Sequence, residues 1–164
     1  MSRISREQMF MDICDVISRR STCGRQNVGA ILVHENKIVS IGYNGPGSGE
    51  PHCKGPNCEL TPSGGCARSI HAESNALGYL KGSDKRGLTL FTTLSPCIHC
   101  AGEIITSSAV QAVYFKQEYR VRDGIDLLIA HGIPVYRITP AGYTLNVSTN
   151  QFVSGPFMLA VPIT

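Results

Sequence analysis

Strand-like and helix-like segments alternate through the second half of the chain, and this order restricts the fold more than any other feature. From residue 70 onward, hydrophobic spacing predicts three helices that alternate with three strands. In chain order these are a helix around 71–80, a strand at 88–94, a helix opened by Pro96 and running to about 107, a strand at 111–115, a helix after Asp123 and a strand at 134–138. This alternation indicates an α/β protein with a partly parallel sheet between helices. We therefore expect functional groups at strand-to-helix turns.

The N-terminal segment is predicted to add one helix and a β-hairpin. Residues 5 to about 20 have apolar side chains at helical spacing, and Ser5 with Gln8 resembles a capping box. Cys14 falls among these apolar positions and is expected to be a core residue. Two β-rich runs at 28–34 and 37–43 follow. A hairpin of this kind would contribute an antiparallel pair to the sheet.

Composition favours one domain and a small ligand. The 164 residues are 42% hydrophobic and 16% charged, which suits a single domain over residues 1–164 but not two ordinary ones. No apolar run approaches the ~18 residues of a membrane span, and the first residues lack a signal-peptide pattern, so we expect a soluble cytoplasmic protein without membrane contact. The net charge is only +3, without a dense Lys/Arg run. A small anionic substrate is therefore favoured over a nucleic acid.

A long irregular segment and most of the cysteines coincide. Between Asn44 and Gly65 the chain is rich in Gly, Pro and Cys and too irregular for a helix or strand. Without a secretion signal, seven cysteines are better explained as metal ligands than as disulfides. Four of them lie in loop-like sequence and would close a tetrahedral structural zinc site: Cys23, Cys53, Cys58 and Cys66. His52 could replace one cysteine, and independent buried thiols are the alternative.

The C-terminal tail allows two interpretations. Residues 140–164 contain alternating and then continuous apolar residues. They could add an edge strand to the sheet or pack on a neighbouring subunit, and the sequence does not distinguish these.

The most informative motifs are His71-Ala72-Glu73 and Pro96-Cys97-Ile98-His99-Cys100, each at a predicted helix start. Cys97 and Cys100 are three residues apart, so their sulfurs share one helical face, and the helix N-terminus favours both thiolates. With His71 they supply three protein ligands, as in a catalytic zinc site that keeps its fourth position for water. Glu73 lies two residues from His71, a poor spacing for a fourth ligand but a suitable one for proton transfer.

Each motif alone is ambiguous, because a lone Cys-x-x-Cys is often a structural zinc site or a redox pair. Together they match H-x-E…P-C-x-x-C, the signature of zinc-dependent nucleobase deaminases. His99 is expected to point away from the metal, and His34 and His131 lie in no motif. A zinc-stabilised binding module, with both cysteine groups structural, is the non-enzymatic alternative. Such a module would have no need of Glu73 beside an open zinc position.

Further segments resemble the deoxycytidylate (dCMP) deaminase family over about residues 18 to 138. They are SRRSTCGRQNVGAILV, IGYNGPGSGEPHC, CARSIHAESNA, TTLSPCIHC and FKQEYR, in the family's order. The resemblance implies a three-layer cytidine-deaminase-like fold with a central mixed five-stranded sheet, hydrolysis of dCMP to dUMP and ammonia for thymidylate synthesis, and a homohexamer. It also implies a second zinc in some members. A deaminase of cytidine, of deoxycytidine or of bases in nucleic acid is the alternative within enzymes.

The same resemblance implies substrate and effector positions. Those matching substrate contacts are Arg25, Asn27, Asn44, Ala72, Ser95 and Tyr119, with Arg120 and Lys116 as weaker candidates. The ordinary interpretations are a solvated loop residue for Arg25 and a core aromatic for Tyr119. In many family members dCTP, with Mg²⁺, activates and dTTP inhibits through a glycine-rich loop, which here contains Asn44, Gly45, Gly47, Ser48 and Gly49. Its glycines would let backbone N–H groups approach phosphate, and a plain turn is the alternative.

Overall fold

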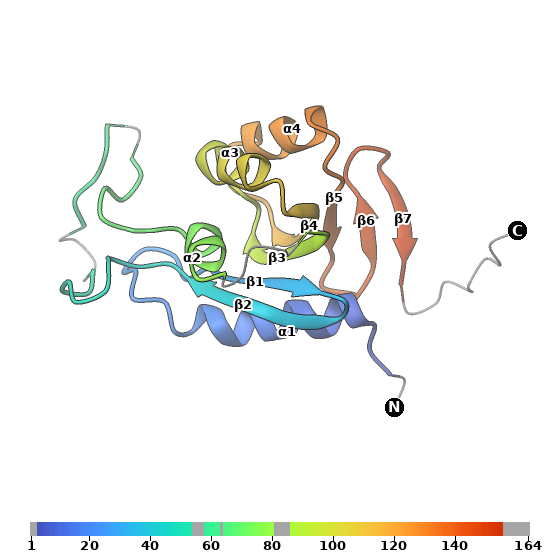
Figure 1. Ribbon diagram of the computed structural model, residues 1–164, viewed down its shortest axis with the longest axis horizontal. Coiled ribbons are helices and arrows are strands. Elements are labelled where there is room, and N and C mark those ends of the chain that lie inside the picture. Colours follow the sequence, from blue (N-terminus) through green and yellow to red (C-terminus); the bar gives the residue numbers. More distant parts are fainter. Residues whose placement is uncertain (1–2, 54–57, 63, 81–85, 156–164) are drawn as a thin grey trace, which may run out of the picture.

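The computed structural model of the chain describes residues 3–53, 58–62, 64–80 and 86–155. Within them, one seven-stranded sheet has the order β2-β1-β3-β4-β5-β6-β7, and helices lie on both of its faces (Figure 1). The elements in chain order are α1 (Arg6–Ser18), β1 (Gly29–His34), β2 (Lys37–Tyr43), α2 (Ala72–Gly78), β3 (Leu88–Leu94), α3 (Ile98–Ser107), β4 (Val110–Gln117), α4 (Asp123–Ala130), β5 (Val135–Ile138), β6 (Thr144–Asn146) and β7 (Gln151–Ser154).

The sheet is mixed, as predicted, but larger than predicted. β1 pairs antiparallel with β2 and β3, and β3, β4 and β5 are parallel. The five predicted strands are all present. The expected count of five is wrong for the whole sheet, because β6 and β7 extend it by two antiparallel strands. The edge-strand interpretation of the tail is thus confirmed for residues 144–154, whereas residues 156–164 lie outside the described part of the chain.

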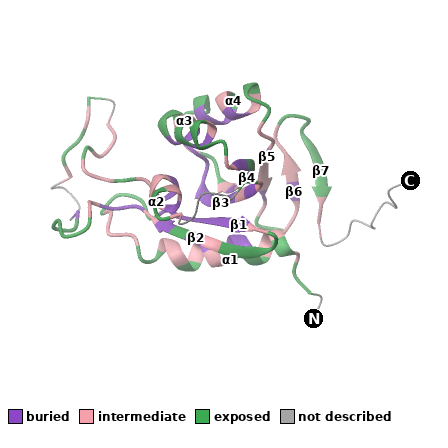
Figure 2. Cartoon of the chain, viewed as in Figure 1, coloured by how far each residue is buried: buried purple, intermediate pink, exposed green. Residues whose placement is uncertain are grey.

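The helices divide into two layers around a core that follows the central strands (Figure 2). α1 packs on one face, where Phe10, Met11 and Cys14 meet Phe91 of β3, so the core position expected for Cys14 is confirmed. α2, α3 and α4 cover the other face (Figure 1). At the start of α1 the Ser5 hydroxyl accepts the Gln8 N–H at 3.0 Å, which confirms half of the predicted capping box. None of the helices in the described segments is long and apolar enough to cross a membrane.

Two close approaches fix the edge of the sheet at which the motifs lie. Glu35 and Asn36 have φ values of 47° and 63°, as a tight two-residue hairpin requires, and they close the predicted β1–β2 pair. At the other end of the hairpin, a Cβ on Gly42 would lie 2.1 Å from the Ala72 carbonyl oxygen. Glycine therefore lets α2 lie directly against β2. The N-termini of α2 and α3 meet at the carboxyl ends of the parallel strands.

Candidate active site

The three predicted metal ligands come together at the N-termini of two helices. His71 and Cys97 are the N-cap residues of α2 and α3, and Cys100 lies in the first turn of α3. His71 Nδ1 is 3.3 Å from Cys100 Sγ and 3.5 Å from Cys97 Sγ. All three ligand atoms lie within 4.8 Å of one another, which fits one tetrahedral ion with a nitrogen and two sulfur donors.

The three side chains of this cluster shift one another's pKa values. Hydrogen bonds with Cys100 and with His71 together lower the pKa of the Cys97 thiol to about 3. The same sulfur contact, together with burial, raises the pKa of Cys100. The hydrogen bond to Cys97 raises the pKa of His71 to about 9. These shifts favour the thiolate at Cys97, and metal binding would displace the protons of the other two ligands.

Glu73 lies beside the cluster without joining it. Its side chain is 4% exposed, and Cys100 Sγ is 3.8 Å from Glu73 Oε2. Burial raises the pKa of the Glu73 carboxyl to about 7. A carboxyl with a pKa near neutrality can both accept and return a proton, as acid-base catalysis requires.

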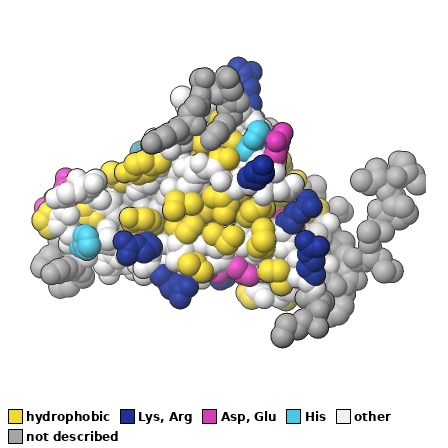
Figure 3. Space-filling view, turned by 60° about the horizontal axis from the view of Figure 1, so that its bottom comes forward, with side chains coloured by type: hydrophobic (Ala, Val, Ile, Leu, Met, Phe, Trp, Pro, Cys, Tyr) yellow, Lys and Arg dark blue, Asp and Glu magenta, His cyan; other side chains and the backbone are white. Residues whose placement is uncertain are grey.

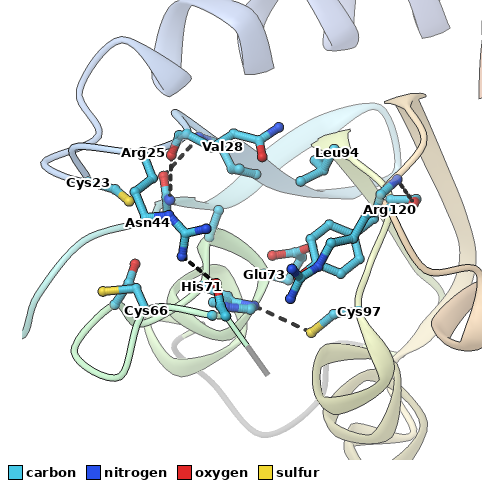
Figure 4. Close-up of a pocket in the computed structure, with 17 residues that line it drawn as sticks. Cys23, Arg25, Val28, Asn44, Cys66, His71, Glu73, Leu94, Cys97 and Arg120 are labelled. Atoms are coloured by element: carbon cyan, nitrogen blue, oxygen red, sulfur yellow. Dashed lines mark hydrogen bonds between the residues drawn. The ribbon is translucent and has the colours of Figure 1, made fainter. Parts of the chain in front are cut away.

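A cavity of about 220 Å³ connects this cluster to the predicted substrate residues. His71, Ala72, Glu73 and Cys97 lie at one side, and Arg25, Asn44, Ser95 and Tyr119 also contribute to the lining (Figure 4). Asn27 is exposed, and its neighbours Gln26 and Val28 line the cavity in its place. Of the two weaker candidates, Arg120 lines the cavity, whereas Lys116 forms an ion pair with Asp15 at 2.6 Å.

Two guanidinium groups contribute to the cavity wall. Arg25 donates a hydrogen bond of 2.6 Å to the Gly64 carbonyl, which lies between Cys58 and Cys66 in the cysteine segment. The Arg120 guanidinium lies 5.6 Å from the centre of the Tyr119 ring. Arginines in these positions can bind an anionic group.

Asn44 and Ser95 organise the cavity walls through hydrogen bonds. The Asn44 amide oxygen accepts the Ser21 hydroxyl at 2.6 Å and the Val28 N–H at 2.8 Å. Ser95 is 2% exposed, and its hydroxyl accepts the Tyr119 N–H at 2.8 Å. Both side chains therefore hold wall segments in place, in addition to facing the cavity.

A model of the cytidine and deoxycytidylate deaminase zinc-binding region matches residues 4–117. The chain belongs to this deaminase family. The deoxycytidylate deaminase of Mycobacterium phage D29 is 34% identical over 129 residues, which cover 71% of this chain and 99% of that protein. ComE operon protein 2 of Bacillus subtilis is 38% identical over 122 residues, covering 73% of this chain and 64% of that protein.

A solved structure also resembles this deaminase. The dCMP deaminase of cyanophage S-TIM5, crystallised with dCMP and dUMP, superimposes with a TM-score of 0.71 at 36% identity. The match covers 84% of this chain and 99% of that chain. The expected fold, a cytidine-deaminase-like α/β sheet with helices on its faces, is thereby confirmed.

The turn that presents Cys97 makes a close contact with α4 that sequence patterns do not predict. Gly124, the second residue of α4, packs against the turn that presents Cys97. A Cβ at Gly124 would lie 2.1 Å from the Pro96 carbonyl oxygen and 2.7 Å from the Cys97 carbonyl carbon. The available signal was a glycine inside a predicted helix, where helix propensity disfavours it by about 1 kcal/mol.

A second sulfur cluster in the deaminase differs from the predicted set of four. Cys58 Sγ lies 3.1 Å from Cys66 Sγ, and Cys53 Sγ lies 4.0 Å from Cys66 Sγ. These three could hold a metal ion, but the cluster does not include Cys23. Cys23 and Cys66 both line the cavity next to the metal ligands. The segment that carries Cys23 also stays close to the cluster, because the Cys53 N–H donates to the Thr22 carbonyl at 3.1 Å.

The predicted effector loop lies at a separate cavity of about 560 Å³ between β2 and α2. Gly47, Ser48 and Gly49 line it, as does His52, which is not among the three side chains of the sulfur cluster. Asn44 faces the cavity next to the metal ligands instead. Two parts of the predicted effector loop therefore line different cavities: Asn44 lines the one next to the metal ligands, and residues 47–49 line the other.

Proposed function

We propose that the chain hydrolyses dCMP to dUMP and ammonia. The observation that carries this proposal is a cavity lined by two of the three metal-binding side chains, by the buried Glu73 carboxyl and by two arginines, Arg25 and Arg120. That arrangement suits a cytosine ring at the metal and a phosphate at the arginines. The S-TIM5 relative, crystallised with dCMP and dUMP, supports the same choice of substrate.

In this mechanism the residues of the chain position the ring and move the protons. Val28 and Leu94 supply apolar wall, and His71, Cys97 and Cys100 would hold zinc. A zinc ion at these ligands would supply Lewis-acid activation of water near neutral pH. Glu73 takes a proton from the water and returns it to the departing amine, so one buried carboxyl acts first as base and then as acid.

The test is ammonia release from dCMP, deoxycytidine and CMP. Two arginines in the cavity wall can bind the phosphate of dCMP but gain no such contact from deoxycytidine, so we expect kcat/KM for dCMP to exceed that for deoxycytidine by about 100-fold or more. Arg120→Gln should reduce this preference, whereas Lys116→Gln should not, because Lys116 pairs with Asp15. Equal kcat/KM for dCMP and deoxycytidine would instead favour a nucleoside deaminase.

A second zinc at Cys53, Cys58 and Cys66 forms part of the proposal. Three thiol groups in one loop cluster provide all but one ligand of a closed tetrahedral structural site. The measured zinc content should be two per chain, and the effects of Cys23→Ser and His52→Ala on that content would reveal the fourth ligand. A content of one per chain, lost on Cys97→Ala, would exclude this second zinc.

Regulation by dCTP with Mg²⁺ and by dTTP is a further part of the proposal. Its support is the cavity beside Gly47, Ser48 and Gly49, whose backbone N–H groups suit a phosphate chain. Rates measured against dCMP concentration with each triphosphate and Mg²⁺ test it. Identical hyperbolic curves in all conditions would leave this loop a plain turn.

We also propose a cytoplasmic homo-oligomer, with a hexamer as the expected state. Exposed apolar side chains on α1 and β2 include Met9, Val16, Ile38 and Ile41. Figure 3 shows hydrophobic side chains gathered on this side of the molecule, with Lys and Arg at the margin. Light scattering on the purified protein would give the subunit number, and a monomer at micromolar concentration would contradict the proposal.

A further inference from the structure

Ser74 and Glu103 form a second contact between the helices that carry the metal ligands. The Ser74 hydroxyl on α2 donates a hydrogen bond of 2.5 Å to the Glu103 carboxylate on α3. Ser74 follows His71 by three residues, and Glu103 follows Cys100 by three. Residues at this spacing share a helix face. The contact therefore lies one turn beyond the pair of His71 Nδ1 and Cys100 Sγ, which are 3.3 Å apart.

The position of the Ser74 proton distinguishes two roles for this hydroxyl. Ser74 Oγ also lies 3.9 Å from Cys100 Sγ, a long contact for a sulfur acceptor. A hydroxyl has one proton to donate, and the 2.5 Å distance to a charged oxygen identifies Glu103 as its acceptor. Glu103 therefore orients the hydroxyl, and Ser74 joins the two helices instead of donating to the sulfur.

On its other side α2 is tied to β2, where the Asn75 amide donates to the Tyr43 carbonyl at 2.8 Å. His71 and Cys97 occupy the N-cap positions of α2 and α3, and neither side chain makes a capping hydrogen bond. α2 has seven residues, too few to be stable by itself. The separation of His71 from Cys100 therefore depends on how α2 is held against α3.

We propose that Ser74 and Glu103 are a pair of positioning residues that latch α2 to α3 and so hold His71 and Cys100 at the separation that a zinc ion needs. The inference rests on the metal site of the proposed function. Removal of outer partners of metal ligands typically costs about 10- to 100-fold in metal affinity. Because Glu103 is exposed, the effect here should fall at or below the lower end of this range.

The test measures zinc release from the purified zinc-loaded protein into excess chelator. The relevant zinc is the fraction that is absent from Cys97→Ala. Ser74→Ala and Glu103→Ala should each accelerate its release by about three- to tenfold. The double variant should resemble either single one, because both substitutions break the same contact. In both single variants the kcat for dCMP should fall while KM stays unchanged. Ser74→Thr keeps the hydroxyl, so it should release zinc as slowly as the parent protein.

Matched controls remove a hydroxyl and a carboxylate elsewhere. The Ser107 hydroxyl on α3 bonds the Ile104 carbonyl of its own helix, and Asp126 on α4 forms an exposed ion pair with Arg122. Ser107→Ala and Asp126→Ala should leave zinc release unchanged. Melting temperatures would verify that all variants are folded.

Three results would overturn the inference. These are release rates within twofold of the parent protein for both single variants, effects that add in the double variant, and faster release from Ser74→Ala but not from Glu103→Ala. The last result would mean that the hydroxyl acts on the Cys100 sulfur directly. Zinc release needs no substrate, so a failure to turn over dCMP would contradict only the proposed function.

Discussion

The two sulfur clusters use similar side chains in different structural settings. His71, Cys97 and Cys100 lie at the N-termini of two helices that pack on one face of the sheet. The second cluster comes from a loop and consists of Cys53, Cys58 and Cys66. In the described part of this loop, Leu60 and Cys66 form an isolated β-bridge. Packing fixes the geometry of the first cluster, whereas a metal would itself order the second. The type of donor atom therefore does not distinguish a catalytic metal site from a structural one. The cavity and the Glu73 carboxyl beside the first cluster do distinguish them.

Replacement of the carboxyl beside the first cluster should have the largest effect. Glu73→Gln keeps the shape of the side chain but removes its ability to carry a proton, so kcat should fall by about 10²- to 10⁴-fold. The zinc content should stay that of the parent protein, because Glu73 lies outside the ligand group. Ammonia release and zinc analysis on the same preparation check this. Zinc loss in the variant would make Glu73 a ligand, and the two clusters would then differ less than we infer.

Crowding the packed cluster should have the next largest effect. Gly124→Ala would drive a Cβ into the Pro96 carbonyl and the Cys97 backbone, at a cost of about 1–3 kcal/mol. We expect zinc bound by His71, Cys97 and Cys100 to be weakened about tenfold, with the loop cluster unaffected.

Gly102→Ala in α3 is the matched control for this substitution. A Cβ at Gly102 meets no atom within 4 Å, so the change should be neutral or stabilising by up to about 1 kcal/mol. Chelator titration and chemical unfolding of both variants check the pair. Equal behaviour of the two variants would show that the α4 contact does not determine the position of Cys97.

A loop-cluster substitution should affect activity less. Cys58 does not line the cavity beside Glu73, so Cys58→Ser should lower the zinc content from two to one while kcat/KM for dCMP falls by less than about tenfold. The melting temperature should fall by several degrees, because the loop loses its metal. Zinc analysis and calorimetry would detect both changes. Loss of both zincs would mean that the clusters form one cooperative unit.

A charge outside both clusters provides the smallest expected effect. Lys116 and Asp15 form a partly exposed ion pair of 2.6 Å, and such pairs contribute less than about 1 kcal/mol. Lys116→Ala should change kcat/KM by less than about twofold, with zinc content unaltered. Steady-state kinetics would measure this. A larger loss of kcat/KM would indicate that Lys116 contacts the substrate.

Local patterns explain what was predictable from the sequence. Cys97 and Cys100 share one helix turn, so their convergence follows from spacing alone. The hairpin at Glu35-Asn36 and the cap at Ser5 are likewise determined by neighbouring residues. Five strands and four helices were recognised from periodicity, because each is long enough to show its repeat.

Contacts distant in sequence were not predictable. Gly124 packs against Pro96, and Ser95 supports Tyr119, in pairs that only the folded chain brings together. Composition alone groups Cys23 with the other loop cysteines, whereas the folded chain brings only Cys53, Cys58 and Cys66 within metal-binding distance of one another among the described residues. Strand β6 has only three residues, too few for a periodic pattern.

The order of the ligands along the chain has a consequence for synthesis on the ribosome. α2, with His71 and Glu73, packs against the β1–β2 hairpin, whereas Cys97 and Cys100 belong to the β3–α3–β4 unit made later. Cys53, Cys58 and Cys66 all precede His71. A nascent chain therefore presents the complete loop cluster while the catalytic ligand set still lacks both of its sulfurs. If both clusters bind zinc as proposed, the loop cluster would be the first to compete for it during translation.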